Sequence, residues 1–229
     1  MKVSPSSVAG IRLIGPASPE FEPALTPLLG RASRELLSPA IPFSVIVANE
    51  TERAIALLGV RFDMTGPRAK PYAVIHYADT LRNPEKADFK AGTKRFVCAE
   101  PAYTALVLGR EGDPSSRGRT NLDNLRQMLG IRASLDCVAY DDGRFDGPDS
   151  LGAFARLAAQ RDVEAAFAAQ VLKLEESGAE ALLMEAAEDS KDRARRTLAR
   201  KLLEAFEAGG FDEMRVRATG HRLKITLWR

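Results

Sequence analysis

The chain has 229 residues, of which 45% are hydrophobic and 28% are charged, and its formal net charge at pH 7 is +2. These values are ordinary for a globular protein, and they exclude a wholly disordered chain and a small domain held together by disulfides. The 33 basic and 31 acidic side chains nearly balance, so charge does not favour strong nonspecific binding to nucleic acid. In addition, no apolar run reaches the ~20 residues of a membrane-spanning helix.

Prolines are concentrated in the first 42 residues and predict irregular chain there. Within this segment we expect a short strand over residues 8–14 and a helical turn over residues 28–37. The first ten residues, MKVSPSSVAG, lack the apolar segment of a signal peptide. Two compartments therefore stay open: the cytoplasm, or an exported location if a leader has been removed.

Residues 43–62 follow a period of two on both sides of the segment Asn49-Glu50-Thr51-Glu52, which predicts a β-hairpin with mostly buried faces and a tight turn. Further strands are expected over residues 72–79, 94–99, 103–108 and 131–139. Two elements are expected between the strands over residues 103–108 and 131–139. They are a polar loop over residues 109–121 and a short helix over residues 122–129, capped by Asn121. Short strands at this spacing favour an antiparallel β-sandwich, because parallel strands need long helices between them.

The segment PFSVIVANETERAIALLGVRFDM resembles a hairpin of a bacterial immunoglobulin-like or fibronectin-type β-sandwich. It shares with that family an apolar alternation, an Asn turn and a long second strand. The resemblance covers residues 40–145 and concerns the fold alone. The Cys–Trp–Cys arrangement of true immunoglobulin domains is missing, because the one Trp is Trp228. No active site is implied by it.

From Pro148 onward the pattern becomes helical. One amphipathic helix is expected to end or kink at Ser177-Gly178, and a second is expected over residues 179–208, stopped by Gly209-Gly210. The alternation of Met214, Val216 and Ala218 predicts the first strand of a C-terminal β-hairpin.

The predicted fold class is therefore α+β, with an antiparallel, Ig-like β-sandwich followed by two α-helices and a C-terminal β-hairpin. The predicted domains are residues 1–147, a β-sandwich with a Pro-rich N-terminal segment, and residues 148–229, a helical pair with the hairpin.

Residues that carry recognisable chemistry are few. The chain has two histidines, His76 and His221, and it lacks the HExxH, CxxC, GxSxG, GxGxxG and Walker motifs. The sequence therefore predicts no catalytic residue, no cofactor and no established type of metal site. Two thiols, Cys98 and Cys137, fall on apolar faces of predicted strands; they are either a disulfide or two reduced core thiols, and the lack of a visible export signal favours reduced thiols.

The densest set of oxygen donors is acidic and lies near the end of the predicted sandwich, at Asp136, Asp141, Asp142, Asp146 and Asp149. Of these residues, Asp141, Asp142 and Asp146 are weak calcium candidates. The spacing of an EF-hand is not met, because the third and twelfth positions counted from Asp142 hold an arginine and an alanine. Turn formation and helix capping explain these acidic residues without an ion.

Two basic segments are candidates for binding anions. The loop over residues 109–121 carries three arginines, although an exposed connector is the favoured interpretation. The polar face of the predicted C-terminal hairpin is a weak candidate for nucleic acid or another anion, and it consists of Arg215, Arg217, Arg222, Lys224 and Trp228. A single aromatic residue is few for a stacking platform, so nucleic acid is not expected as the partner.

The favoured functional hypothesis is a noncatalytic binding or scaffold module that interacts with proteins. A sandwich supplies rigid loops for recognition, and catalytic side chains are scarce. The amphipathic helices predict a protein partner or a homodimer. Two alternatives stay open: a carboxylate-based hydrolase acting on glycans, which needs two acids across a cleft, and RNA binding by the C-terminal hairpin.

Overall fold

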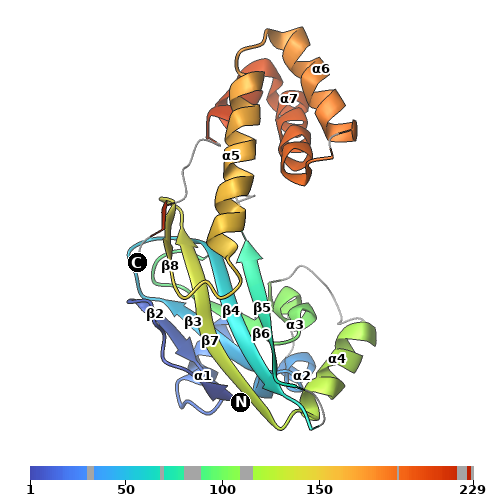
Figure 1. The fold of residues 1–229 in the computed structure, drawn as a ribbon. Helices are drawn as coiled ribbons and strands as arrows, with labels where there is room; N and C mark the ends of the chain where they lie inside the picture. The colour runs from blue at the N-terminus through green and yellow to red at the C-terminus, as the bar shows by residue number, and fades with distance from the viewer. Residues whose placement is uncertain are drawn as a thin grey trace. The chain divides into compact units, whose positions relative to one another are not determined.

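A computed structural model describes residues 1–29, 34–67, 70–79, 89–108, 116–189, 191–220 and 226–227. The chain divides into two compact units, Met1–Ser150 and Leu151–Leu227 (Figure 1). The first unit contains two β-sheets with short helices beside them, and the second is helical.

Sheet A of the first unit is built around two strands of 11 residues each, β4 (Ile55–Thr65) and β7 (Gly130–Tyr140), which run antiparallel to each other. The strand β5 (Tyr72–Asp79) pairs antiparallel with the free side of β4, and β8 (Arg144–Asp146) pairs antiparallel with β7. The short strand β1 (Lys2–Val3) pairs with β7 in parallel. Sheet A is therefore mixed.

Sheet B places β3 (Ser44–Asn49) between β2 (Ile11–Ile14) and β6 (Lys94–Cys98), and both pairs are antiparallel. The two sheets contribute to one hydrophobic core, which includes Ile46 and Phe96 from sheet B and Leu58, Phe62 and Leu135 from sheet A. Burial of these apolar side chains is the main stabilising contribution to the unit.

Short helices flank these strands in the described parts of the first unit. Their bounds are α1 Phe21–Leu25, α2 Arg34–Leu37, α3 Pro101–Val107 and α4 Ser116–Arg126, and two 3₁₀ turns span Thr26–Leu28 and Ile41–Phe43. The segment 28–37, for which the sequence predicts a helical turn, contains α2.

The predicted hairpin over residues 43–62 is wrong. Both of its strands exist, but β3 belongs to sheet B and β4 belongs to sheet A. All six residues of β3 are buried. A strand that is buried on both faces does not reveal its pairing partner through alternation. The turn after Asn49 therefore connects two sheets instead of two neighbouring strands.

The predicted strand over residues 103–108 is also wrong, because this segment forms α3. Pro101 stands in the first turn, and the Glu100 side chain caps the helix by accepting a hydrogen bond from the Ala102 N–H at 3.3 Å. Tyr103 and Leu106, three residues apart, are buried on one side. The next helix, α4, begins at Ser116 and includes Asn121, which therefore is not its cap.

The second unit consists of α5 (Ala153–Val171), α6 (Glu176–Asp189), α7 (Arg193–Gly220) and the two-residue strand β9 (Thr226–Leu227). The helices cover one another's apolar sides. Their shared core includes Phe167 and Val171 from α5, Leu183 from α6, and Leu198 and Leu202 from α7.

Two features of this unit differ from the prediction. Ser177-Gly178 lies in the first turn of α6, so it does not end a helix, and the expected helix over residues 179–208 is split between α6 and α7. Gly210 does break the helical geometry, with φ 74° and ψ −166°, but the chain then resumes as helix. Met214 and Ala218, four residues apart, are buried as one helical face, whereas Val216 is 68% exposed.

The predicted fold class, an antiparallel Ig-like β-sandwich followed by two helices and a C-terminal hairpin, is therefore wrong. The chain is α+β, with a mixed sheet, helices between β6 and β7, and α5, α6 and α7 in the second unit. Among the described residues, we find no helix long and apolar enough to cross a membrane.

Candidate functional site

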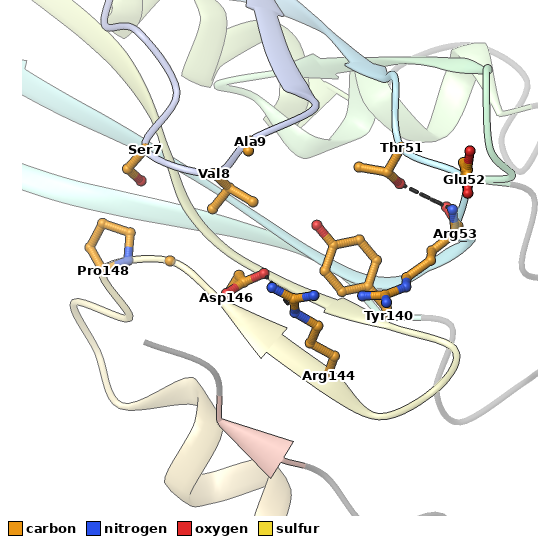
Figure 2. A pocket seen from close by; sticks show the side chains of 11 residues that line it. Ser7, Val8, Ala9, Thr51, Glu52, Arg53, Tyr140, Arg144, Asp146 and Pro148 are labelled. Carbon is orange, nitrogen blue, oxygen red and sulfur yellow. Dashed lines mark hydrogen bonds and ion pairs between the residues drawn. The ribbon is translucent and has the colours of Figure 1, made fainter.

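A groove of about 720 Å³ opens at one end of the first unit. Three segments meet there: residues 7–9 before β2, residues 51–53 between β3 and β4, and residues 140–148 around β8 (Figure 2). Strand ends position all three segments, so the groove is formed by loops on a packed scaffold. Its volume falls within the range of sites that hold small molecules or short peptide segments.

Two arginines line the groove, and each is held by a carboxylate. The Arg53 Nε lies 3.3 Å from Asp142 Oδ2, and the Arg144 Nε lies 3.3 Å from Asp146 Oδ2. Both arginine side chains keep a third or more of their surface exposed, at 43% and 34%. Such partly exposed pairs add little to stability, commonly below about 1 kcal/mol. Their effect is to orient the guanidinium groups.

The aromatic ring of Tyr140 lies between these arginines in Figure 2. Arg53 stacks over this ring, with its guanidinium carbon 5.8 Å from the ring centroid. Tyr140 is 3% exposed and belongs to the core of the unit. Burial raises the pKa of the Tyr140 phenol, and the nearby charge of Asp146 raises it further. An ordinary phenol has a pKa of about 10, so the hydroxyl is protonated at neutral pH and can donate a hydrogen bond.

The loop that carries Arg53 is held by the buried side chain of Asn49, at the end of β3. The Asn49 Nδ2 donates to the carbonyl oxygens of Arg53 at 2.7 Å and Lys90 at 3.1 Å. The Asn49 Oδ1 accepts from the Thr51 N–H at 3.2 Å and from the Thr51 hydroxyl at 2.6 Å. One amide thus satisfies several backbone groups of the turn.

Of the three calcium candidates, Asp141 and Asp142 lie in the turn after β7, and Asp146 lies on β8. The Asp142 Oδ1 accepts from the Arg144 N–H at 3.0 Å, in addition to the contact of Oδ2 with Arg53. Asp146 lies against Arg144, and Asp141 is exposed. Within the described ranges, the acidic group that could hold a metal ion contains Asp136 and Asp149 from the same stretch, together with Cys137.

The two cysteines are both described, and both are buried outside any disulfide. Cys98 belongs to the core between the sheets. Burial raises the pKa of its thiol to about 12, so the thiolate does not form at neutral pH. A disulfide, the less favoured alternative from the sequence, is not present.

Of the two histidines, His76 lies on β5 and His221 lies outside the described residues. The His76 ring meets the ring of Phe62 edge-on, with centroids 5.4 Å apart. Burial lowers the pKa of His76, which keeps the imidazole neutral. Among the described residues, its Nε2 atom is buried without a hydrogen-bond partner.

The basic residues proposed for nucleic acid do not form a strand face where they are described. Arg215 and Arg217 lie on α7, and Arg222, Lys224 and Trp228 lie outside the described residues. Residues two apart on a helix point in different directions. The Arg215 guanidinium stacks on Phe211, at 5.5 Å from the ring centroid, and Arg217 lies 3.8 Å from Glu213. In the loop over residues 109–121, the described part belongs to α4.

Sequence analysis missed the groove residues Arg53, Tyr140 and Arg144. The sequence did indicate the turn at residues 49–52, which directly precedes Arg53. It did not indicate that β3 and β4 pair in different sheets, or that the segment around Arg53 meets the segment around β8. Comparison of the chain with family models, with curated proteins and with solved structures gave no match.

Proposed function

We propose that this chain is a noncatalytic binding module, and that its groove takes a short segment of a partner protein. The observation that carries the proposal is the arrangement of Arg53 and Arg144 beside the buried Tyr140. Arginine and tyrosine residues that are held in place before binding are typical of the strongest contacts in protein interfaces.

The chemistry of the lining supports a peptide rich in hydrogen-bond acceptors. Each guanidinium has five N–H donors, and the Arg53 side chain, 43% exposed, contacts Asp142 through its Nε. The Tyr140 hydroxyl, which is protonated at neutral pH, adds another donor. Carbonyl groups of a peptide backbone and an acidic side chain would accept these bonds.

Charge and shape make a strongly anionic ligand less suitable than a peptide. The groove contains two basic residues, Arg53 and Arg144, and two acidic ones, Glu52 and Asp146, so its formal charges cancel. Val8 and Pro148 add apolar surface to the lining. This mixture suits a segment with both polar backbone and apolar side chains.

Peptide selection tests the proposal. A random peptide library displayed on phage is selected on the purified chain, and the affinity of an enriched peptide is measured by fluorescence anisotropy. Substitution R53A or R144A should weaken binding at least tenfold, which is about 1.4 kcal/mol. R126A is the matched control, because Arg126 is an exposed arginine paired with Asp123 at 2.8 Å on α4, outside the groove.

Two results contradict the proposal. One is that no peptide is enriched over an unrelated protein of similar charge. The other is that an enriched peptide binds R53A, R144A and R126A equally well, which would place its site elsewhere.

The other functional hypotheses stay predictions. A homodimer through the helices of the second unit is tested by light scattering, where a mass of twice the chain would support it. For a glycan hydrolase, Glu52 and Asp146 are acids in the groove, but Asp146 lies against Arg144. RNA binding now depends on residues beyond Gly220, because Arg215 and Arg217 are helical.

A further inference from the structure

Outside the groove, three potential metal ligands come together in the first unit. Asp136, Cys137 and Asp149 each offer one donor atom, and these atoms lie within 4.8 Å of one another. Asp136 and Cys137 are consecutive residues of β7, and Asp149 follows β8. The first two are buried and Asp149 is half-buried, which leaves a side open to solvent.

An irregularity in β7 creates this arrangement. Cys137 pairs with Gly59 of β4, whereas the next pair joins Leu135 to Val60, so Asp136 is an extra residue in β7. Consecutive side chains of a regular strand point to opposite faces of the sheet. A β-bulge re-aims a side chain, and bulges are common beside functional sites. Here the bulge brings the Asp136 and Cys137 donor atoms close to each other.

The chain after β8 then returns to the bulge. The Asp149 N–H donates to the Asp136 carbonyl oxygen at 3.0 Å, and the Ser150 N–H donates to Asp136 Oδ1 at 3.0 Å. Asp149 has a positive φ of 52°, which is uncommon for a residue other than glycine. Strained backbone of this kind is often retained at functional sites.

The second carboxylate oxygen of Asp136 supplies an independent indication of a ligand. Asp136 is 1% exposed, and its Oδ2 is buried with no hydrogen-bond partner in the described part of the chain. Leaving a buried carboxylate oxygen unsatisfied is costly, and the neighbouring Asp149 carboxylate adds like charge. The nearby Arg61 is directed at Asp63, with its Nε 2.8 Å from Asp63 Oδ1. A bound cation would compensate both carboxylates.

We propose that Asp136, Cys137 and Asp149 bind a divalent transition-metal ion of the zinc type. A thiolate ligand disfavours calcium and magnesium, which take oxygen ligands, and two carboxylates with one thiolate suit Zn²⁺ or Co²⁺. Zinc bonds of roughly 2.0–2.3 Å place tetrahedral donors about 3.5 Å apart, so the three donors need to move by about 1 Å. Binding replaces the proton of the Cys137 thiol, which passes to water, and leaves a fourth position for water.

Cobalt titration of the reduced full-length chain tests the site. Co²⁺ should produce the thiolate-to-cobalt charge-transfer band in the near ultraviolet, together with visible bands of tetrahedral cobalt, and Zn²⁺ should abolish both. C137S should remove the charge-transfer band, and D136N should weaken cobalt binding at least tenfold. The matched controls are C98S, at the other buried cysteine, and D141N, at an exposed acid of the same stretch; both should keep the wild-type spectrum and affinity.

The proposal is overturned if the wild-type chain gives no charge-transfer band with Co²⁺, or if the band survives in C137S. The wild-type spectrum decides this even if a variant does not fold. As a second measurement, Zn²⁺ should raise the melting temperature of the wild type more than that of D136N, and equal shifts would also overturn it.

Discussion

The side-chain Nδ2 of Asn49 donates to the carbonyl oxygen of Arg53 at 2.7 Å. This contact joins the end of β3 to the backbone of an arginine that lines the groove. The same amide group also contacts Lys90 and Thr51, so one buried side chain connects the turn at residues 49–53 to Lys90. Asn49 is therefore a structural determinant of the groove without lining it.

Substitution N49A should destabilise the fold by roughly 2–4 kcal/mol, because it removes the hydrogen bonds that the buried Asn49 amide makes with Arg53, Lys90 and Thr51. Urea unfolding followed by circular dichroism measures the change. N124A, at an exposed position of α4, is the control and should change stability by less than about 0.5 kcal/mol. Equal effects of the two substitutions would show that the Asn49 hydrogen bonds are not important for stability.

The predicted turn at residues 49–52 illustrates what the sequence could and could not reveal. The Asn-Glu-Thr pattern indicated a turn, and a turn with Asn49 bonded to Thr51 is present. The pattern did not tell which strands the turn connects, because pairing depends on contacts distant in the sequence. Ser44 pairs with Cys98, for example, which is 54 positions away.

Gly147 should not tolerate a side chain. Its φ is 121°, and an added Cβ would lie 2.5 Å from the Asp136 carbonyl oxygen and 2.8 Å from Cys137 Cα. Both neighbours are backbone, which cannot move without disturbing β7. Substitution G147A should therefore cost about 3 kcal/mol or more, from the clash together with the strain of the left-handed conformation.

Gly152 is the matched control for this prediction. Its φ is also positive, at 64°, but a Cβ there would meet no atom within 4 Å. G152A should cost only the conformational penalty, about 1 kcal/mol. Urea unfolding compares the two variants, and a G147A chain as stable as G152A would mean that the loop does not pack against Asp136 as described.

Gly59 also lacks room for a side chain, but here the close neighbours are side chains and not backbone. A Cβ on this residue would lie 2.7 Å from Cys137 Sγ and 3.0 Å from the ring of Tyr77. G59A should destabilise by roughly 1–3 kcal/mol. In a C137A background the sulfur is absent, so the same substitution should cost at least about 1 kcal/mol less. A double-mutant cycle measured by urea unfolding tests this, and strictly additive costs would contradict the contact.

His76 should make stability depend on pH in the mildly acidic range. Burial lowers its pKa in the folded chain from the ordinary value of 6.5, so the unfolded chain binds a proton first as pH falls. The stabilisation from neutral His76 is therefore complete above about pH 6.5 and is lost below it. An NMR titration, with H76Q used to assign the imidazole signal, should give a pKa below 6.5. A value of 6.5 or higher would contradict the burial of this ring.

Elements were predicted correctly where neighbouring residues carry a clear signal, and incorrectly where a short pattern fits two structures. The strand over residues 72–79 was predicted correctly, because its run of aromatic and β-branched residues is a local signal. Residues 214–218 show the limit, because Met214, Val216 and Ala218 fit alternation, but only Met214 and Ala218 are buried. Three residues cannot separate a period of two from a helical spacing of four.

The candidate sites were harder to predict than the elements. The sequence showed Asp136 and Asp149 within one acidic stretch, but their proximity depends on the extra residue in β7, which pairing with β4 defines. Likewise, Arg53 and Arg144 are 91 positions apart and meet through the ends of strands. Long-range pairing of this kind leaves little trace in a single sequence.

Hydrogen exchange of the chain saturated with a selected peptide tests the binding proposal most directly. Backbone amides should become protected within residues 7–9, 51–53 and 140–148, the segments that line the groove, while α6 and α7 exchange as in the free chain. Protection confined to the helices of the second unit, with no change around the groove, would contradict the account.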